Sequence, residues 1–286
     1  MIKKAVLPVA GLGTRFLPAS KATPKEMLPI IDKPLVQYAV EEAINVGVQE
    51  IIFITSNEKH SIEKHFQENN AIAEKLIKSG KEEYLERLNP KIFSDVKFHY
   101  INQNNQHGLG DAVLHAEEIV GDDSFAVLLP DDLFFSNISC LSQLIDTYKQ
   151  TKSSVIAVNK IDKENIHKYG VINPGKKEHD AIVIENIVEK PNADEAPSDI
   201  AVCGRYIFTS LIFDHLKATN FDKSGEIQLT DAIKTLIQNQ KVHARLYEGE
   251  KFDCGSKKGF VHATIALALR DSSMSDDISK IIKEII

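Results

Sequence analysis

The stretch A-V-L-P-V-A-G-L-G-T-R-F-L-P, residues 5 to 18, joins a short apolar run to a turn with two glycines and an arginine. The apolar run predicts a buried strand, and Gly11 and Gly13 predict a tight turn directly after it. Backbone N–H groups of such a turn can converge on phosphate oxygens, because glycine allows close approach. The stretch therefore predicts either a simple turn that carries a charge or a phosphate cradle with Arg15 as its first cation.

Two other glycine motifs do not fit this turn. The dinucleotide fingerprint G-x-G-x-x-G requires a third glycine where this chain has Phe16, and Asp32 does not end a second strand. No G-x-x-x-x-G-K-[ST] motif follows the strand. Prolines at positions 18, 24 and 29 exclude a regular helix. Residues 11–29 therefore predict a long loop over the strand ends, where ligands bind in open α/β sheets.

Positive charge is concentrated near this loop. Up to residue 40 the acids are Glu26 and Asp32, and the cations are Lys3, Lys4, Arg15, Lys21, Lys25 and Lys33. A solvated face accounts for Lys3, Lys4 and Lys33. It accounts less well for Arg15 and Lys25, which lie among glycines and prolines, so the pattern favours a polyanionic ligand.

Composition limits the class of protein. The chain has 286 residues, 43% of them hydrophobic, and can bury a sizeable core. A net charge of −7 argues against a general nucleic-acid binder and against attachment to an anionic membrane. The first residues mimic a signal peptide, but Pro8 and the glycine turn favour a first strand. Three widely spaced cysteines predict a reducing, cytoplasmic location without a disulfide framework.

Short apolar runs alternate with helical patterns through the first half. This alternation predicts a doubly wound, mainly parallel but mixed, Rossmann-like α/β sheet whose strands are buried on both faces. A helical insertion is expected at residues 74–90. Strands are expected at residues 4–10, 50–56, 96–102, 124–130 and 153–159, and helices at residues 35–46, 58–88, 111–120 and 138–148.

The pattern changes after residue 160 without a linker. Two strands joined by a turn, a further strand, a helix at residues 227–238 and a late strand that leads to F-D-C-G-S are expected. We therefore predict one domain over residues 1–286, with a nucleotide-binding half at 1–160 and a sugar-phosphate-binding half at 161–270. A C-terminal helix at 271–286 places an apolar stripe on one face, which must pack on this chain or a partner subunit. The stripe consists of Ile278, Ile281, Ile282, Ile285 and Ile286.

Five motifs in order carry a specific resemblance. They are G-x-G-T-R-x-x-P with P-K-E-M-L-P, Q-x-x-x-x-G-L-G-D-A from Gln103, L-P-D-D from Leu129, V-E-K-P from Val188 and F-D-C-G-S from Phe252. Together they resemble the nucleotidyltransferases that make nucleoside-diphosphate sugars, over residues 3 to about 270. Their form is most similar to the bacterial UTP–glucose-1-phosphate uridylyltransferases. Thymidylyltransferases of sugar nucleotides begin instead with a G-G-x-G-T-R turn.

The charged residues of these motifs suit phosphate and metal binding even without the resemblance. Arg15 offers a planar fork to phosphate and Lys25 a point charge. Asp131 ends an apolar strand, and Asp253 also follows a strand. Such carboxylates suit Mg²⁺, which usually takes one or two of them plus substrate phosphates. Arg15, Lys25 and Lys190 are the expected catalytic cations.

The resemblance also implies how the substrates are held. Ala10, Gly11, Gln103 and Gly108 are expected at the uridine, with Gly108 making room for the ring, while Gly170, Glu189 and Lys190 are expected at the glucose and its phosphate. Gly13, Glu26 and Asp132 complete the expected substrate-binding set. The implied ligands are UTP, glucose 1-phosphate, UDP-glucose and pyrophosphate, and the implied assembly is a homodimer or homotetramer.

Simpler interpretations remain for single residues and for the whole chain. Asp111 is best interpreted as a helix cap, which is also an option for Asp132, and Glu189 with Lys190 could form a surface ion pair. The histidines show no metal spacing. The alternative functions are a nucleotidyltransferase for another base or sugar, a catalytically silent regulatory paralogue, and a glycosyltransferase of similar fold.

Overall fold

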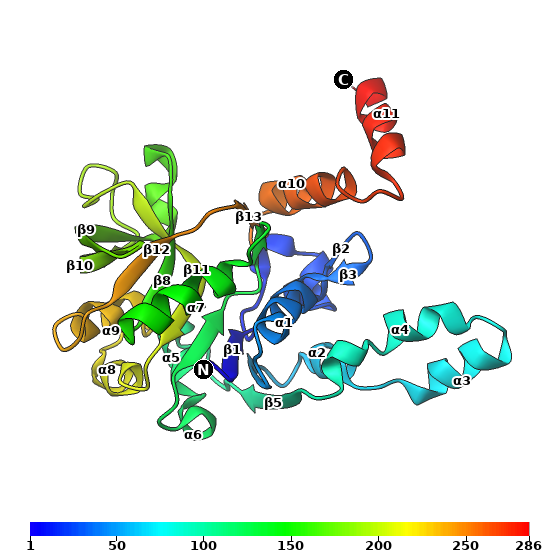
Figure 1. Ribbon diagram of the computed structural model, residues 1–286, viewed down its shortest axis with the longest axis horizontal. Helices are drawn as coiled ribbons and strands as arrows, with labels where there is room; N and C mark the ends of the chain where they lie inside the picture. Colours follow the sequence, from blue (N-terminus) through cyan, green and yellow to red (C-terminus); the bar gives the residue numbers. More distant parts are fainter. Residues whose placement is uncertain (286) are drawn as a thin grey trace.

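The structure, a computed structural model, describes residues 1–285. One nine-stranded sheet runs through the molecule (Figure 1). In sheet order its strands are β5 (Lys97–Asn102), β4 (Glu50–Thr55), β1 (Lys4–Pro8), β6 (Phe125–Leu128), β11 (Ile200–Phe208), β8 (Val155–Lys160), β12 (His243–Leu246), β10 (Ala181–Glu189) and β9 (Gly170–Glu178).

The sheet is mixed, and the mixture follows the two halves of the chain. Strands β5, β4, β1 and β6 are mutually parallel, with Ala5 opposite both Ile51 and Ala126. Strand β11 comes from the second half and lies antiparallel between β6 and β8. The prediction of a mixed α/β sheet is confirmed, and most of its parallel pairs lie in the first half of the chain. The division of the chain at residues 160 and 270 stays a prediction.

Helices cover both faces of the sheet, because alternate residues of each strand enter different cores. The helices are α1 (Leu35–Asn45), α2 (His60–Phe66), α3 (Asn70–Lys78), α4 (Leu85–Leu88), α5 (Gly108–Leu114), α6 (Glu117–Val120), α7 (Cys140–Thr151), α8 (Ile212–Ala218), α9 (Leu229–Leu236), α10 (Lys257–Ala268) and α11 (Ser275–Ile285). Val6 packs in one core with α5, α8 and α9, whereas Ala5 and Leu7 pack in the other with α1, α2 and α7.

One expectation about burial is wrong. The side chains of β5 are exposed or only half-buried, whereas those of β1 and β4 are largely buried. The reason is its position, since β5 is the edge strand and pairs only with β4. An apolar run alone does not distinguish an edge strand from a central one.

Two small sheets lie outside the main one. Strands β2 (Pro29–Ile30) and β3 (Lys33–Pro34) form a short hairpin after the glycine-rich loop. Strands β7 (Asp132–Phe135) and β13 (Glu250–Asp253) pair antiparallel and place Asp132 opposite Asp253. This second pairing brings the L-P-D-D and F-D-C-G-S motifs together from positions about half the chain apart.

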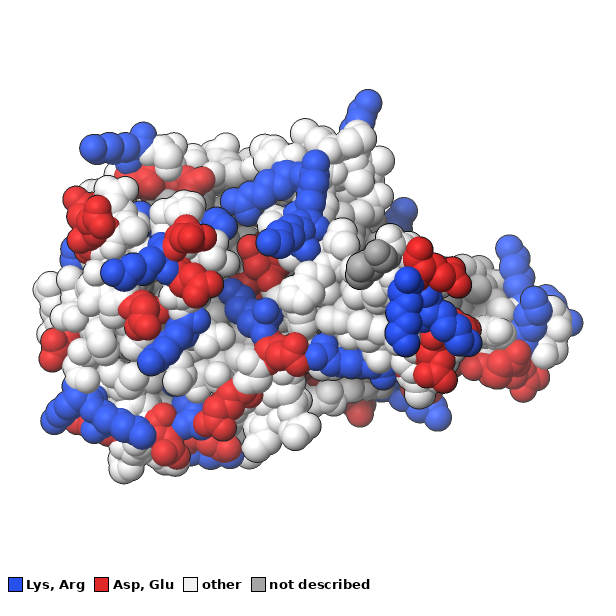
Figure 2. Space-filling model, turned by 90° about the horizontal axis from the view of Figure 1, so that it is seen from above, with Lys and Arg blue, Asp and Glu red and all other residues white. Residues whose placement is uncertain are grey.

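Two parts of the chain project from the body. Helices α3 and α4 form an arm on one side, and α11 extends away at the C-terminal end (Figure 1). None of the residues of α11 is buried, and Ile281 and Ile285 are 47% and 78% exposed. Ile286 of the expected stripe lies outside the described residues. Positive and negative side chains alternate over the face and arm in Figure 2. Within residues 1–285, no helix combines the length and apolar character needed to cross a bilayer.

Candidate active site

The glycine turn follows β1 and leads into a long loop, as predicted. Three short 3-10 segments, Thr14–Phe16, Ala19–Lys21 and Lys25–Met27, interrupt it. Gly13 has φ +64°, and a Cβ there would lie 3.2 Å from the Lys25 Cβ. Within the described chain, the backbone N–H groups of residues 10 to 13 donate no hydrogen bond. The turn therefore presents free donors, which a phosphate cradle requires.

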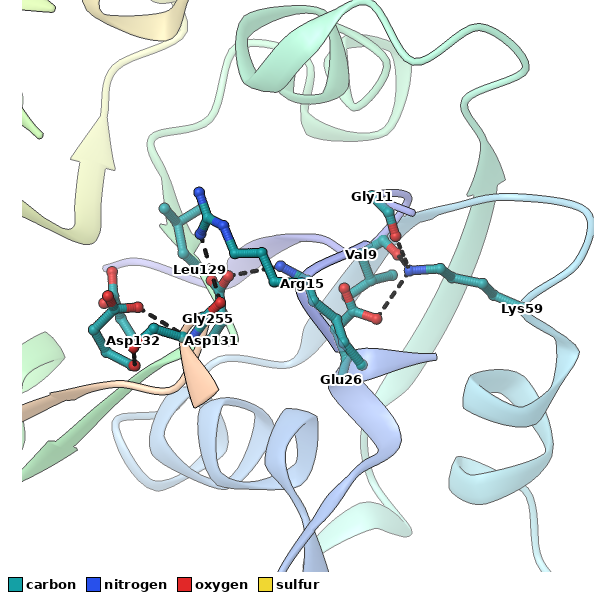
Figure 3. Close-up of polar contacts among 12 residues, drawn as sticks. Val9, Gly11, Arg15, Glu26, Lys59, Leu129, Asp131, Asp132 and Gly255 are labelled. Atoms are coloured by element: carbon teal, nitrogen blue, oxygen red, sulfur yellow. Dashed lines mark hydrogen bonds and ion pairs between the residues drawn. The ribbon is translucent and has the colours of Figure 1, made fainter. Parts of the chain in front are cut away.

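A buried lysine that sequence analysis missed holds the other side of this turn. Lys59 donates to the carbonyls of Val9 and Gly11 (2.6 Å for Gly11) and pairs with Glu26 at 2.9 Å (Figure 3). Lys59 is 9% exposed and Glu26 2%. Burial raises the pKa of Glu26 and lowers that of Lys59. Because its carboxylate is engaged by Lys59, Glu26 supports the turn, and its expected substrate contact stays a prediction.

A cleft of about 450 Å³ opens beside the turn. Its walls come from the ends of β1 and β6, the glycine-rich loop and the start of α5. Predicted site residues from three separate motifs meet here. They are Ala10, Gly11, Gly13, Lys25, Glu26, Gln103, Gly108 and Asp131.

Gln103 lies at the end of β5 and is 4% exposed. Its backbone N–H donates to Thr55 (2.8 Å), which fixes its position at the edge of the sheet. Its side-chain Nε2 donates to the carbonyl of Gly108 (3.2 Å) and to Oδ2 of Asp111 (2.6 Å). The amide is therefore oriented by the start of α5.

One expectation about this helix is wrong. Asp111 does not cap it, because α5 begins at Gly108 and the carboxylate accepts from Gln103 instead. Gly108 lines the cleft, so its expected role of making room for the base stays a prediction, and packing also requires glycine at this position. It has φ +93°, and a Cβ there would lie 2.8 Å from Glu226 and 2.9 Å from the carbonyl of Ile227.

The two predicted metal carboxylates face one gap. A Cβ on Gly255 would lie 2.9 Å from Asp131 Oδ2 and 3.1 Å from Asp253 Oδ1, so only glycine leaves the gap free. Lys25 Nζ lies 2.7 Å from Asp131 Oδ2. Burial opposes the charge on Asp131, but the Lys25 ammonium lowers the pKa of Asp131 and keeps it ionised.

This donor set fits Mg²⁺ rather than a metal held by protein alone. Among the described residues, no cluster of three or more His, Cys, Asp and Glu could hold a metal ion. Mg²⁺ does not need one, because it keeps waters and takes one or two carboxylates together with substrate phosphates.

Asp132 has a different environment from its neighbour. It starts strand β7, so the helix-cap option is wrong. Its Oδ1 lies 2.8 Å from Lys251 Nζ, and burial raises the pKa of Asp132 to about 6. It does not line the cleft. The expected substrate contact of Asp132 stays a prediction.

A second buried cation supports the L-P-D-D loop and was also missed. Arg205 of β11 is 1% exposed and donates to the carbonyls of Leu129 (2.8 Å) and Asp132 (3.0 Å), on either side of Asp131. Its Nε donates to Glu42 of α1 at 3.0 Å. Arg205 thus fixes the backbone that carries the Asp131 carboxylate.

Arg15 is exposed and does not itself line the cleft. Its only hydrogen bond within the described residues is a long one of 3.5 Å to the carbonyl of Gly255 (Figure 3). Gly255 borders the gap between Asp131 and Asp253. Arg15 is therefore beside the carboxylate gap with most of its donors free.

The remaining predicted residues meet at the β9–β10 hairpin. Gly170 is directly opposite Glu189 across the pair. Thr230 donates to Glu189 Oε2 at 2.7 Å, and Lys190 pairs with Oε1 at 3.0 Å. Glu189 and Lys190 therefore form the ion pair that the simpler interpretation expected. None of the three predicted residues lines the 450 Å³ cleft.

The chain is similar to known nucleotidyl transferases over nearly its whole length. The family model described as nucleotidyl transferase matches residues 4–269. The chain belongs to the nucleotidyl transferase family. A curated relative from Staphylococcus epidermidis, named UTP--glucose-1-phosphate uridylyltransferase, is 45% identical over 285 residues, covering 99% of this chain and 98% of the relative.

Solved structures extend the likeness of this nucleotidyl transferase to the whole fold. A UTP-bound UGPase from Acinetobacter baumannii has a TM-score of 0.92 and 38% identity, with all of both chains covered. A UDP-glucose pyrophosphorylase complexed with UDP-glucose has a TM-score of 0.84 and 40% identity, covering 93% of this chain and 98% of that one.

Proposed function

We propose that the protein transfers the uridylyl group of UTP to α-D-glucose 1-phosphate, giving UDP-glucose and pyrophosphate. A relative 45% identical over nearly the full chain is named for this reaction. Structures of the same fold are described as bound to UTP and to UDP-glucose. The observation that carries the proposal is the cleft in which free turn N–H groups, Lys25 and Asp131 converge.

The chemistry needs positioning more than proton transfer. A phosphate oxygen of glucose 1-phosphate forms a bond to the α-phosphorus of UTP, and the bond to the β-phosphate oxygen breaks. The second pKa of a phosphate monoester is about 6, so the nucleophile is already largely ionised near neutral pH. The free N–H groups, Arg15, Lys25 and Lys190 offset the charge of the two polyanions. One anhydride replaces another, so the reaction is reversible.

We assign Mg²⁺ to Asp131 and Asp253. When bound, it would neutralise phosphate charge beside the gap at Gly255. The two carboxylates support this assignment, because both oxygens border one space that only glycine leaves free. Lys25 stays charged there, since Asp131 and Glu26 outweigh burial and raise the pKa of Lys25.

The two substrates divide between two parts of the site in this proposal. Ala10, Gly11, Gln103 and Gly108 hold uridine in the cleft. Gly170, Glu189 and Lys190 hold glucose and its phosphate at the hairpin. The separation of the two groups in the structure supports the division, because the hairpin residues lie outside the cleft.

Pyrophosphate release distinguishes the candidate functions. The protein with Mg²⁺, UTP and glucose 1-phosphate is expected to release pyrophosphate faster than with any other nucleotide or sugar phosphate in a panel. A stronger response to another pair would indicate a related nucleotidyltransferase. No release with any pair would favour a regulatory paralogue, and turnover of UDP-glucose without pyrophosphate would favour a glycosyltransferase.

We further propose that the protein is a cytoplasmic homodimer or homotetramer. All three cysteines are buried and unpaired, which suits a reducing compartment. The apolar stripe on α11 is largely uncovered in the single chain, and such a face is an aggregation hazard unless a partner covers it.

Shortening the chain tests this assembly. A chain that ends at Asp277 is expected to form a smaller assembly or to lose solubility in light scattering, because it lacks the stripe. Ile281→Glu should act similarly, while Lys283→Glu, on the opposite face of α11, should not. Unchanged assembly and solubility in the shortened chain would contradict the proposal.

A further inference from the structure

The orientation of the Gln103 amide is decided by its partners. The terminal amide atom assigned as Nε2 lies 2.6 Å from Asp111 Oδ2 and 3.2 Å from the carbonyl oxygen of Gly108. An ionised carboxylate and a carbonyl only accept hydrogen bonds. The amide must therefore turn its NH₂ group towards them, because the opposite orientation would place oxygen against two oxygens.

The other end of the amide has no partner within the described residues. Within the described residues, Gln103 Oε1 accepts no hydrogen bond, and it is not among the buried polar atoms without a partner. Oε1 is therefore accessible, although the whole residue is only 4% exposed. Gln103 lines the cleft together with Ala10 and Gly11, and it also lines an adjoining pocket that shares Ala10 with the cleft. A base that packs against Gln103 would therefore meet the accessible oxygen as a fixed acceptor.

A fixed acceptor discriminates between pyrimidine bases. Uracil carries a hydrogen on N3 and can donate to it, whereas N3 of cytosine has a lone pair and would meet an oxygen. A site that offers the wrong hydrogen-bonding group leaves buried polar atoms unpaired, which rejects the wrong base strongly. A freely rotating amide could serve both bases, because it could present either end.

We propose that Asp111 is a positioning residue for base selection. It holds the Gln103 amide with Oε1 towards the base, so that the site accepts the N3–H of uracil and rejects cytosine. This inference rests on the proposed function, in which Gln103 contacts uridine. Asp111 is suited to the role because its side chain is 13% exposed, and its other near ionisable neighbour, His115 Nδ1, is 3.7 Å away.

Replacing the acid by an apolar residue or a hydroxyl tests the proposal. In Asp111→Leu only Gly108 still orients the amide, and in Asp111→Ser the hydroxyl can donate as readily as accept. Both variants are expected to lower the ratio of kcat/KM for UTP to that for CTP at least about tenfold, mainly by losing activity with UTP. Asp111→Asn should retain most of the ratio, because its Oδ1 can accept from Gln103. Pyrophosphate release with each nucleotide measures the ratio.

The controls separate this proposal from the proposed function and from folding. Glu117→Leu removes an acid from the next helix, α6, and should leave the ratio unchanged. Circular dichroism shows which variants fold, and the serine variant serves if the leucine variant does not. If the wild-type protein prefers UTP but Asp111→Leu and Asp111→Ser lose activity equally with UTP and CTP, Asp111 is merely structural and the inference is overturned. If the wild-type protein does not prefer UTP, the proposed function itself has failed.

Discussion

Asp131→Asn is expected to keep the fold and to lower turnover by about two to three orders of magnitude. Asparagine preserves the shape of the side chain but removes the negative charge that faces the gap beside Gly255. The loss should be largest at limiting Mg²⁺, because a neutral amide is a poorer ligand for a hard cation than a carboxylate. Turnover measured over a series of Mg²⁺ concentrations gives the result.

The control for this variant is another Asp→Asn change outside the site. Asp123 is an exposed acid that pairs with Lys4 at 2.8 Å, and it precedes β6 whereas Asp131 follows that strand, so the two lie at opposite ends of it. Asp123→Asn should retain wild-type turnover at every Mg²⁺ concentration. Near-normal turnover of Asp131→Asn at limiting Mg²⁺ would show that the metal is held elsewhere.

Local pattern predicts the strands of the first half but not how the second half joins them. Five strands coincide with apolar runs that polar or turn residues bound, so their positions can be predicted from the sequence. They are β1, β4, β5, β6 and β8. The position of β11 between β6 and β8 cannot be predicted in this way, because strand order depends on pairing between segments far apart in sequence. The same non-local pairing brings β7 to β13 and with it Asp132 opposite Asp253.

Residues that end strands or lie in glycine turns were predictable, whereas residues that support them were not. Asp131 and Gln103 follow apolar runs, and their position alone places them at the ligand edge of the sheet. Lys59 and Arg205 instead act on backbone carbonyls of other segments. A single lysine or arginine in a sequence is most often exposed, so nothing in the pattern signals that these two are buried.

The role of Asp111 was missed for a related reason. The sequence pattern predicts a helix that starts at Asp111, which would make this residue a cap, but α5 starts three residues earlier at Gly108. Helix boundaries are the least certain part of a sequence-based assignment. A shift of less than one turn therefore changed a backbone cap into a partner of Gln103.

Glu189→Ala is expected to raise KM for glucose 1-phosphate and to lower turnover, with little change in UTP affinity. Glu189 is held by Thr230 and Lys190 at the hairpin and does not line the cleft, so its loss should not disturb the uridine side. A lost hydrogen bond to a charged group costs about 1.5–3 kcal/mol, or roughly one to two orders of magnitude. Glu185→Ala, on the same strand but near Gly175, is the matched control.

Arg15→Ala is expected to show the opposite division of effects. Arg15 lies beside the carboxylate gap with most of its donors free, so its removal should weaken UTP and pyrophosphate binding more than glucose 1-phosphate binding. Calorimetric titration of UTP into the Glu189→Ala and Arg15→Ala variants compares the two directly. Because Glu189 and Arg15 belong to different segments and share no contact, their effects should add in the double variant. Equal loss of UTP affinity in both single variants would mean that the two substrates are not divided between the cleft and the hairpin.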